Sequence, residues 1–129
     1  MNKRVVDNEI DLAYQLLAKY NIAENGKIDK TYRGQVSSFG AAITMGSLLS
    51  AVAYFSEKGG ASVDRQNILK AIYDIVKEQH KNEQFPSTLF EYINNQKSRG
   101  TSSEKACKED ILNAAIALKL AMNLYELVD

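Results

Sequence analysis

The sequence predicts a single all-α domain: a small helical bundle of about five helices, with a long buried central helix and a long C-terminal helix. Apolar residues recur at spacings of three and four through most of the chain, which is the period of an amphipathic helix. The composition, with abundant Ala, Leu, Lys and Glu, one Pro and no Trp, also favours helices over strands. A chain of 129 residues can bury one hydrophobic core but not two, so residues 1–129 are expected to form one domain.

The first predicted helix reaches about Tyr20, with Asp7 as its cap or in its first turn. Its buried stripe consists of Val6, Ile10, Ala13, Tyr14, Leu17 and Tyr20, which recur at spacings of three and four. Residues 21–29 are expected to form a loop, because Asn25 followed by Gly26 is a common turn signal.

The central stretch, residues 32–58, carries no charge between Arg33 and Glu57 and is rich in Gly, Ser and Ala. At the helical period, its large apolar side chains fall on every face, and a helix that is apolar all round must be buried on all sides. We therefore expect one central helix that begins near Lys30 and ends at Lys58, about 40 Å long. A membrane span is the alternative for an uncharged run of this length. The polar Ser, Thr and Gln side chains within the run favour a buried helix of a soluble protein.

A third helix is predicted from Ser62, its N-cap, to about His80. Its buried stripe consists of Ile68, Leu69, Ile72, Ile75 and Val76. On its solvent side, Asp74 is spaced to pair with Lys70 and with Lys77.

Two further helices complete the predicted bundle. Pro86 and the following Ser87 open a short helix that contains Leu89, Phe90, Tyr92 and Ile93. Thr101 and Glu104 have the spacing of a capping box, which predicts the start of a long final helix that ends near Val128. The inner stripe of that helix consists of Ile111, Ala115, Leu118, Met122 and Tyr125.

The reactive side chains argue against catalysis and against a cofactor. His80, the single histidine, lies near a polar helix end, where a solvated residue is expected rather than a general base. Cys107, the single cysteine, excludes an internal disulfide and indicates a reducing cytoplasm. Neighbouring lysines and a helix start could lower the pKa of its thiol, but most single cysteines are inert, and no function is assigned to it. No metal-ligand spacing and no phosphate-binding glycine loop occurs in the sequence. We therefore expect no enzyme activity, no metal and no cofactor.

The charges limit what the chain can do with nucleic acid. Sixteen basic residues balance sixteen acidic ones, which argues against tight binding by the chain alone, because such binding rests on neutralising phosphates. A subunit that adds a few cations to a shared channel is not excluded. Tyr32, beside Lys30 and Arg33, could stack on a base. The alternative, which the usual burial of aromatic side chains favours, is packing against the first helix.

A pattern within the central stretch is similar to that of a known family. It consists of Tyr32, Phe39-Gly40, Ile43, Gly46, Leu48, Ala51, Ala53, Tyr54-Phe55 and Lys58-Gly59. The pattern resembles the signature of the small α-helical subunit of the Cmr-type (type III-B) CRISPR RNA-targeting complex. The resemblance implies a non-catalytic, cytoplasmic subunit for antiviral defence. Its implied partners are the other Cmr subunits, the duplex of crRNA and target RNA within the assembly, and further copies of itself stacked head to tail.

The same resemblance suggests which side chains meet RNA phosphates. Lys58 matches the lysine of the family pattern and is the leading candidate. Lys30 and Arg33 begin a helical stripe that continues through residues 37, 41 and 44, and Lys105 and Lys108 at the start of the last helix are further candidates. For each of them the alternative is an ordinary solvated surface cation.

Three other functions remain open at this point. One is the small subunit of the related type III-A (Csm) complex, which does the same work. Another is a helical adaptor that binds only protein and makes no RNA contact. The third is a bundle enzyme or ligand carrier built around Met45 and the small residues near it.

Overall fold

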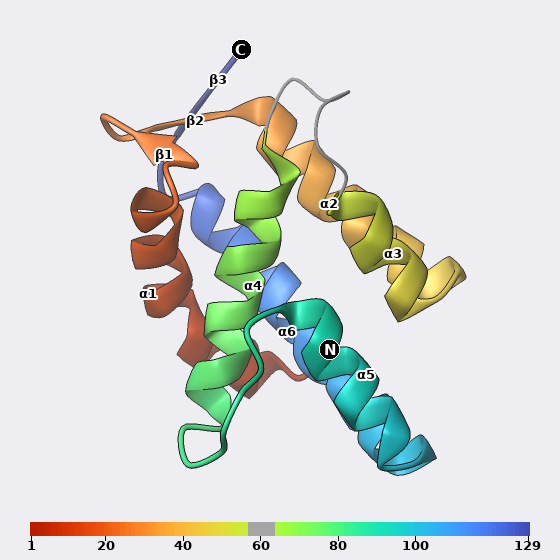
Figure 1. Cartoon of the computed structure of the whole chain (residues 1–129). Coiled ribbons are helices and arrows are strands. Elements are labelled where there is room, and N and C mark those ends of the chain that lie inside the picture. The colour runs from red at the N-terminus through yellow and green to blue at the C-terminus, as the bar shows by residue number, and fades with distance from the viewer. Residues whose placement is uncertain (57–63) are drawn as a thin grey trace.

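The computed structural model describes residues 1–56 and 64–129, and these form a bundle of six helices beside a small three-stranded sheet (Figure 1). The elements are α1 (Lys3–Lys19), β1 (Ala23–Glu24), β2 (Lys27–Asp29), α2 (Lys30–Met45), α3 (Leu48–Phe55), α4 (Arg65–Gln79), α5 (Leu89–Ser98), α6 (Thr101–Met122) and β3 (Glu126–Val128). The predicted helical class is therefore confirmed.

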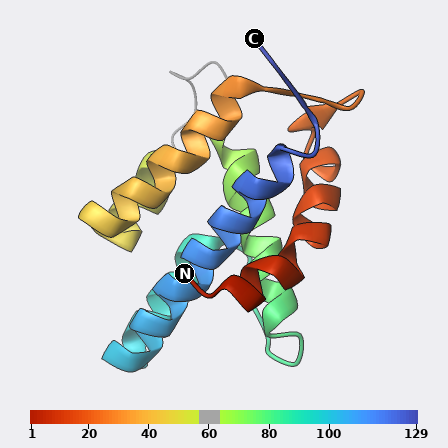
Figure 2. The same ribbon diagram turned by 180° about the vertical axis from the view of Figure 1, so that it is seen from behind.

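The helix at the centre of the bundle is α6, the longest in the described part of the chain. It packs against α1, α2, α4 and α5, and Figure 2 shows it in front of α4 with α1 and α2 on its two sides. Its buried side chains include Ile111, Ala114, Ala115, Ala117, Leu118, Ala121 and Met122. The alanines leave room for neighbouring helices to approach closely, so the C-terminal helix has the central position that the sequence suggested for residues 30–58.

The central stretch is two helices rather than one. It breaks at Gly46 and Ser47, and α3 then folds back alongside α2 (Figure 1). Ser47 caps α3, because its hydroxyl oxygen accepts a hydrogen bond from the backbone N–H of Ser50 at 3.1 Å. The prediction of a single helix about 40 Å long is therefore wrong. No helix in residues 1–56 or 64–129 has both the length and the apolar character needed to cross a bilayer.

The hairpin of α2 and α3 explains why this stretch is apolar on every side. The two helices bury one face against each other, where the rings of Phe39 and Phe55 lie 5.0 Å apart, and another against the bundle. Met45, at the turn, is 87% exposed, and Tyr54 is 59% exposed. Burial on all sides, expected for these two residues, is therefore wrong.

Replacing Gly46 with alanine is expected to destabilise the fold by about 1–3 kcal/mol. A Cβ atom on residue 46 would lie 2.9 Å from the backbone oxygen of Ala42, which accepts the last hydrogen bond of α2 and has no freedom to move away. Gly40→Ala is the matched control, since its Cβ would meet no heavy atom within 4 Å and a helix-interior alanine stabilises by about 0.5–1 kcal/mol. Urea denaturation of both variants checks the opposite signs, and equal stability of the two would contradict this account of the break.

Residues 21–29 form a hairpin rather than an irregular loop. Asn25 and Gly26 occupy its turn with φ of 54° and 75°, as the turn signal predicted. Strand β3 then pairs in parallel with β2, with Ile28 opposite Leu127. Because the chain leaves the helix at Met122 to make this pairing, the prediction that the last helix continues to Val128 is wrong.

The ends of α1 and α4 differ in detail from the predicted boundaries. Asn2 caps α1 through its side-chain oxygen, so Asp7 lies within the helix beyond its first turn. Asp64 caps α4 by accepting the backbone N–H of Gln66 at 2.9 Å. Ser62, the predicted cap, lies outside the described residues.

The starts of α5 and α6 also shift by one or two residues. Thr88 caps α5, two positions after Pro86. Gly100 occupies the cap position of α6 and provides no side chain, while Thr101 is the first helical residue. The predicted capping box of Thr101 is therefore wrong, although the helix begins where it was expected.

Asp74 links α1 to α4. Its carboxylate pairs with Lys77 at 3.2 Å, as the spacing predicted, and with Lys19 at 3.4 Å. It also accepts a hydrogen bond of 2.5 Å from the hydroxyl of Tyr20. Burial, together with that bond, raises the pKa of Tyr20 to about 12. The carboxylate therefore connects the C-terminal end of α1 to the C-terminal half of α4.

Candidate nucleic-acid interface

A shallow groove runs between α2 and α6, and we call it the α2–α6 groove. It is a cavity of about 270 Å³, and small residues make up much of its surface. Its lining residues are Val36, Ser37, Gly40, Ala41, Thr44, Leu112, Ala115, Ile116 and Lys119. Lys119 is the one charged side chain among them, so the groove carries positive charge only.

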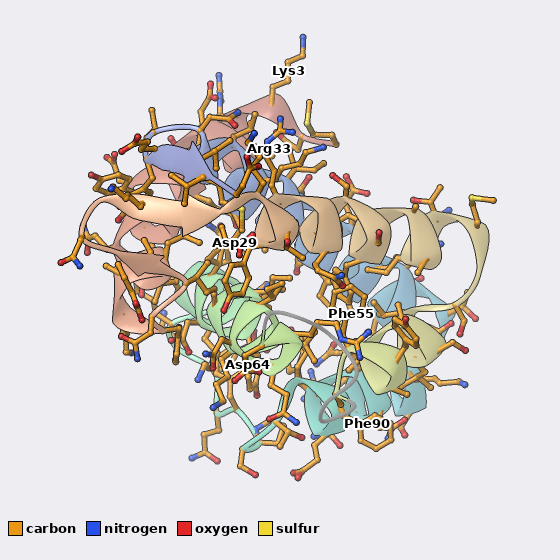
Figure 3. All side chains as sticks on the ribbon, turned by 90° about the horizontal axis from the view of Figure 1, so that it is seen from above. Lys3, Asp29, Arg33, Phe55, Asp64 and Phe90 are labelled. Carbon is orange, nitrogen blue, oxygen red and sulfur yellow. The ribbon has the colours of Figure 1, made fainter. Side chains whose placement is uncertain are left out.

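The predicted cationic stripe of α2 leads into this groove. Residues 37, 41 and 44, through which the stripe was expected to continue, all line the groove. Lys30 and Arg33 lie on the first turn of α2, at one end of the groove, and Figure 3 shows Arg33 on that helix near the C-terminal segment. The helical period thus places these two cations correctly on one face with the small residues.

Both cations at this end have local partners near the C-terminus. The Lys30 ammonium nitrogen lies 3.2 Å from a carboxylate oxygen of Asp129, and both side chains are well exposed. Arg33 donates a hydrogen bond from Nε to the side-chain oxygen of Asn123 at 3.0 Å. An exposed ion pair contributes at most about 1 kcal/mol, so a phosphate can replace Asp129 as the partner of Lys30 at little cost.

The other candidates lie on α6. Lys105 and Lys108 continue through Leu112, Ile116 and Lys119 at spacings of three and four, so all five share one stripe of the helix. From Lys105 to Lys119 this stripe extends about 21 Å. The sequence interpretation missed Lys119, although the same spacing would have found it once α6 was known to pack beside α2.

Lys108 also borders a second cavity. This cavity, of about 240 Å³, lies where the start of α3 meets α5 and α6, and its charged lining residues are Lys97, Glu104 and Lys108. Lys108 is half-buried and Lys105 is exposed. Lys105 and Lys108 therefore lie beyond the end of the groove opposite to Lys30 and Arg33, while Lys119 lies within the groove.

Two other residues, Lys58 and Tyr32, were considered for RNA contact, and the structure describes one of them. Lys58, the leading candidate, lies among residues 57–63, which the structure does not describe. Tyr32 is half-buried against the hydrophobic core, and burial raises the pKa of its hydroxyl. This position favours packing of the ring against the core over an open face for base stacking.

His80 and Cys107 differ from expectation. The two ring nitrogens of His80 lie 2.9 Å from Asp110 and 3.1 Å from Glu83, so His80 is a paired residue at the contact of α4 with α6 and not a solvated one. Cys107 is 2% exposed, and burial raises the pKa of its thiol to about 12, with Asp110 and Glu104 adding to the rise. The lysines do not lower this pKa, because the Cys107 side chain is buried in the core, and the inert cysteine agrees with the structure.

Within residues 1–56 and 64–129, no group of three or more His, Cys, Asp or Glu side chains is arranged to hold a metal ion. The α2–α6 groove and its two ends instead present individual lysine and arginine side chains. These can neutralise phosphates along a groove whose small side chains allow close approach.

Comparison with known proteins identifies the family. The model of the family described as "CRISPR-associated protein (Cas_Cmr5)" matches residues 9–121, which is most of the chain. No curated protein and no solved structure matches it. The matched range includes the whole of the α2–α6 groove. The chain therefore belongs to the CRISPR-associated Cas_Cmr5 family and is a small subunit of the Cmr type.

Proposed function

We propose that this chain is the non-catalytic small subunit of a type III-B (Cmr) effector complex and that its α2–α6 groove lies along the target RNA strand paired with the guide crRNA. The observation that carries the proposal is the charge of one face. Lys119 lies in the groove, Lys30 and Arg33 lie at one end, and Lys105 and Lys108 lie beyond the other. Lys58 remains a candidate from the family pattern.

The affinity of the isolated chain for RNA is expected to be low. The net charge is zero, and each phosphate contact adds only a share of a salt-dependent affinity. RNA sequence is read by the pairing guide in such complexes, so the subunit needs to hold the backbone and not to recognise bases. A few cations on one face are sufficient for that work.

The proposal also includes assembly with other Cmr subunits and with further copies of the chain, and exposed apolar side chains support it. The proposed location of this complex is the cytoplasm. Met45, Tyr54 and Phe90 are large apolar side chains exposed by 87%, 59% and 46%. Exposed apolar side chains can become buried when the chain meets another subunit, and this would add to the free energy of association. The family match supports membership of a Cmr complex over the type III-A alternative.

The test is charge reversal within a reconstituted complex that carries its guide RNA. Lys119→Glu is expected to weaken target RNA binding about tenfold and to reduce the salt dependence of the affinity by about one phosphate contact. Lys70→Glu, an exposed lysine of α4 outside the groove, is the matched control and is expected to change neither quantity. Filter binding at two salt concentrations measures both.

The same experiment separates the rival function. If the complex contains the Lys119→Glu chain at the normal amount and binds target RNA as the unmodified complex does, the groove makes no RNA contact. The chain would then be an adaptor that binds only protein. Loss of the chain from the complex with this variant would also contradict the proposal, because a groove that meets RNA is not needed for assembly.

A further inference from the structure

A second surface, between α1 and α4, has the opposite charge. We call it the α1–α4 pocket: a cavity of about 360 Å³ whose polar lining residues are Asn8, Glu9, Asp11, Gln15, Glu78 and Gln79. The pocket has three carboxylates and three amides, and none of its described lining residues is basic. Glu78 pairs with Lys81 at 2.7 Å, and Glu9 and Asp11 are the other two acids of the lining.

Glu9 differs from the other polar residues of this pocket because it is buried. The residue is 2% exposed, whereas Asn8, Asp11 and Gln79 around it are exposed. Its oxygen Oε1 has no hydrogen-bond partner among the described residues. A buried carboxylate oxygen without a partner costs free energy, so its presence at the bottom of an acidic pocket calls for a missing donor.

The chemistry of the lining decides what the donor can be. Phosphate groups are excluded because the pocket presents only carboxylates and amides. A divalent metal needs several clustered carboxylate, imidazole or thiolate ligands, and the described residues contain no such group. A cationic organic group with several N–H donors satisfies both the carboxylates and the amide oxygens.

We propose that the α1–α4 pocket receives an arginine side chain from a neighbouring protein subunit and that its guanidinium pairs with Glu9. A guanidinium presents five N–H donors in a planar fork that matches a carboxylate, and it keeps its charge when buried. The amide oxygens of Asn8, Gln15 and Gln79 accept the remaining donors. A lysine ammonium has three donors and no such fork, so it fits the lining less well.

The source of the arginine is a protein because the chain is a subunit of a complex. This inference rests on that membership and not on the RNA contact proposed above, since a different pair of helices carries it. Burial and the nearby charge of Asp110 raise the pKa of Glu9 to about 7. A cation that binds beside Glu9 would favour its ionised form. Pairing would ionise Glu9, so a proton is released to the solvent as the guanidinium enters.

The first experiment tests the pocket in the purified chain without RNA. L-Argininamide is titrated while nuclear magnetic resonance follows the side-chain amides of Gln15 and Gln79. We expect saturable shifts with argininamide and at least tenfold weaker binding of citrullinamide, the uncharged analogue of the same shape. Lysinamide is expected to bind more weakly than argininamide. Equal binding of argininamide and citrullinamide, or of argininamide and lysinamide, would overturn the proposal.

Variants assign the effect to Glu9. Glu9→Gln keeps the shape and removes the charge, and it is expected to weaken argininamide binding at least tenfold. Asp11→Asn is expected to weaken it less, since that carboxylate is exposed. Asp7→Asn is the matched control, because Asp7 is an exposed acid of α1 outside the pocket. Glu9→Gln that binds argininamide as the unmodified chain does would contradict the assignment.

The second experiment tests the occupant in the assembled complex. Retention of the chain is measured in complexes purified without target RNA, so that failure of the RNA proposal cannot affect the result. Loss of one partner of a buried charge pair weakens association strongly, and we expect Glu9→Gln to reduce the affinity of the chain for its neighbours at least tenfold. Asp7→Asn is expected to leave it unchanged. Equal retention of both variants would show that no subunit places an arginine there.

Discussion

Replacing Phe39 with alanine is expected to lower the free energy of unfolding by about 3–5 kcal/mol, the largest effect of any substitution considered for this chain. Phe39 is fully buried on α2, and its ring lies 5.0 Å from that of Phe55 on α3. The substitution removes both the burial of the ring and its contact across the hairpin, and it leaves a cavity that rigid helices cannot fill.

An effect of this size is large compared with the total. The free energy of unfolding of an ordinary domain is about 5–15 kcal/mol, so the variant would lose a large part of its stability. Urea denaturation followed by circular dichroism measures the change. An unchanged denaturant slope would show that the native and unfolded states are the same in both proteins.

Phe90→Ala is the matched control for Phe39→Ala. Phe90 is 46% exposed on α5, and Figure 3 shows it at the periphery of the molecule. The same loss of atoms should therefore cost only about 1 kcal/mol or less. If both variants lost equal stability, the hairpin contact of α2 with α3 would not be the reason for the effect.

Replacing Glu9 with glutamine is expected to stabilise the isolated chain by about 2–3 kcal/mol at pH 8 and to have almost no effect at pH 4. The pKa of Glu9 is raised from 4.5 to about 7 in the folded chain. Burial is the largest cause, the charge of Asp110 adds to it, and a side-chain hydrogen bond with Gln79 opposes it.

The direction of the pH dependence follows from where the proton is held. Between pH 4.5 and about 7 the folded chain keeps a proton on Glu9 that the unfolded chain has lost, so stability falls as the pH rises. Above about pH 7 the whole cost is present, because a buried carboxylate must be ionised. The other charged groups around this site are Asp110, which is paired with His80, and Asp11 and Glu78 at the rim of the α1–α4 pocket.

Thermal unfolding across this pH range measures the prediction. At pH 8 the Glu9→Gln chain should melt about 10 °C above the unmodified chain, and the two should converge on acidification. Glu78→Gln, an exposed acid of the same pocket, is the control, and its effect should be small at every pH. A constant difference between Glu9→Gln and the unmodified chain at all pH values would show that ionisation of Glu9 is not its cause.

The sequence predicted those parts of the fold that depend on local periodicity. The stripe of Ile68, Leu69, Ile72, Ile75 and Val76 is buried as expected, because spacings of three and four determine which face of a helix meets the core. The break at Gly46 was not predicted, since the helical period of the apolar residues is the same in a continuous helix and in a hairpin of two helices. Strand β3 was missed for a similar reason: it exists only because β2 lies beside it.

For the candidate interface too, the sequence predicted the face of a helix but not which helices lie side by side. The helical period placed Lys30 and Arg33 on the face that leads to residues 37, 41 and 44. Lys119 could not be chosen, because nothing in the sequence states that α6 lies beside α2. Likewise Glu9 was not among the candidates from the sequence, because its burial comes from contacts with α4 and α6.

The parallel pairing of β2 with β3 has a consequence for how the chain folds. It joins Lys27 to Glu126, which are separated by nearly the whole sequence, through only three residue pairs. The entropy of closing so long a loop must be offset before these few contacts form, so the helices have to assemble first. The strand pairing is thus a late step, and the same reasoning makes it the first contact to open in the native state. Opening of this pairing would free the C-terminal segment whose Asp129 pairs with Lys30, and so leave that lysine available to a partner.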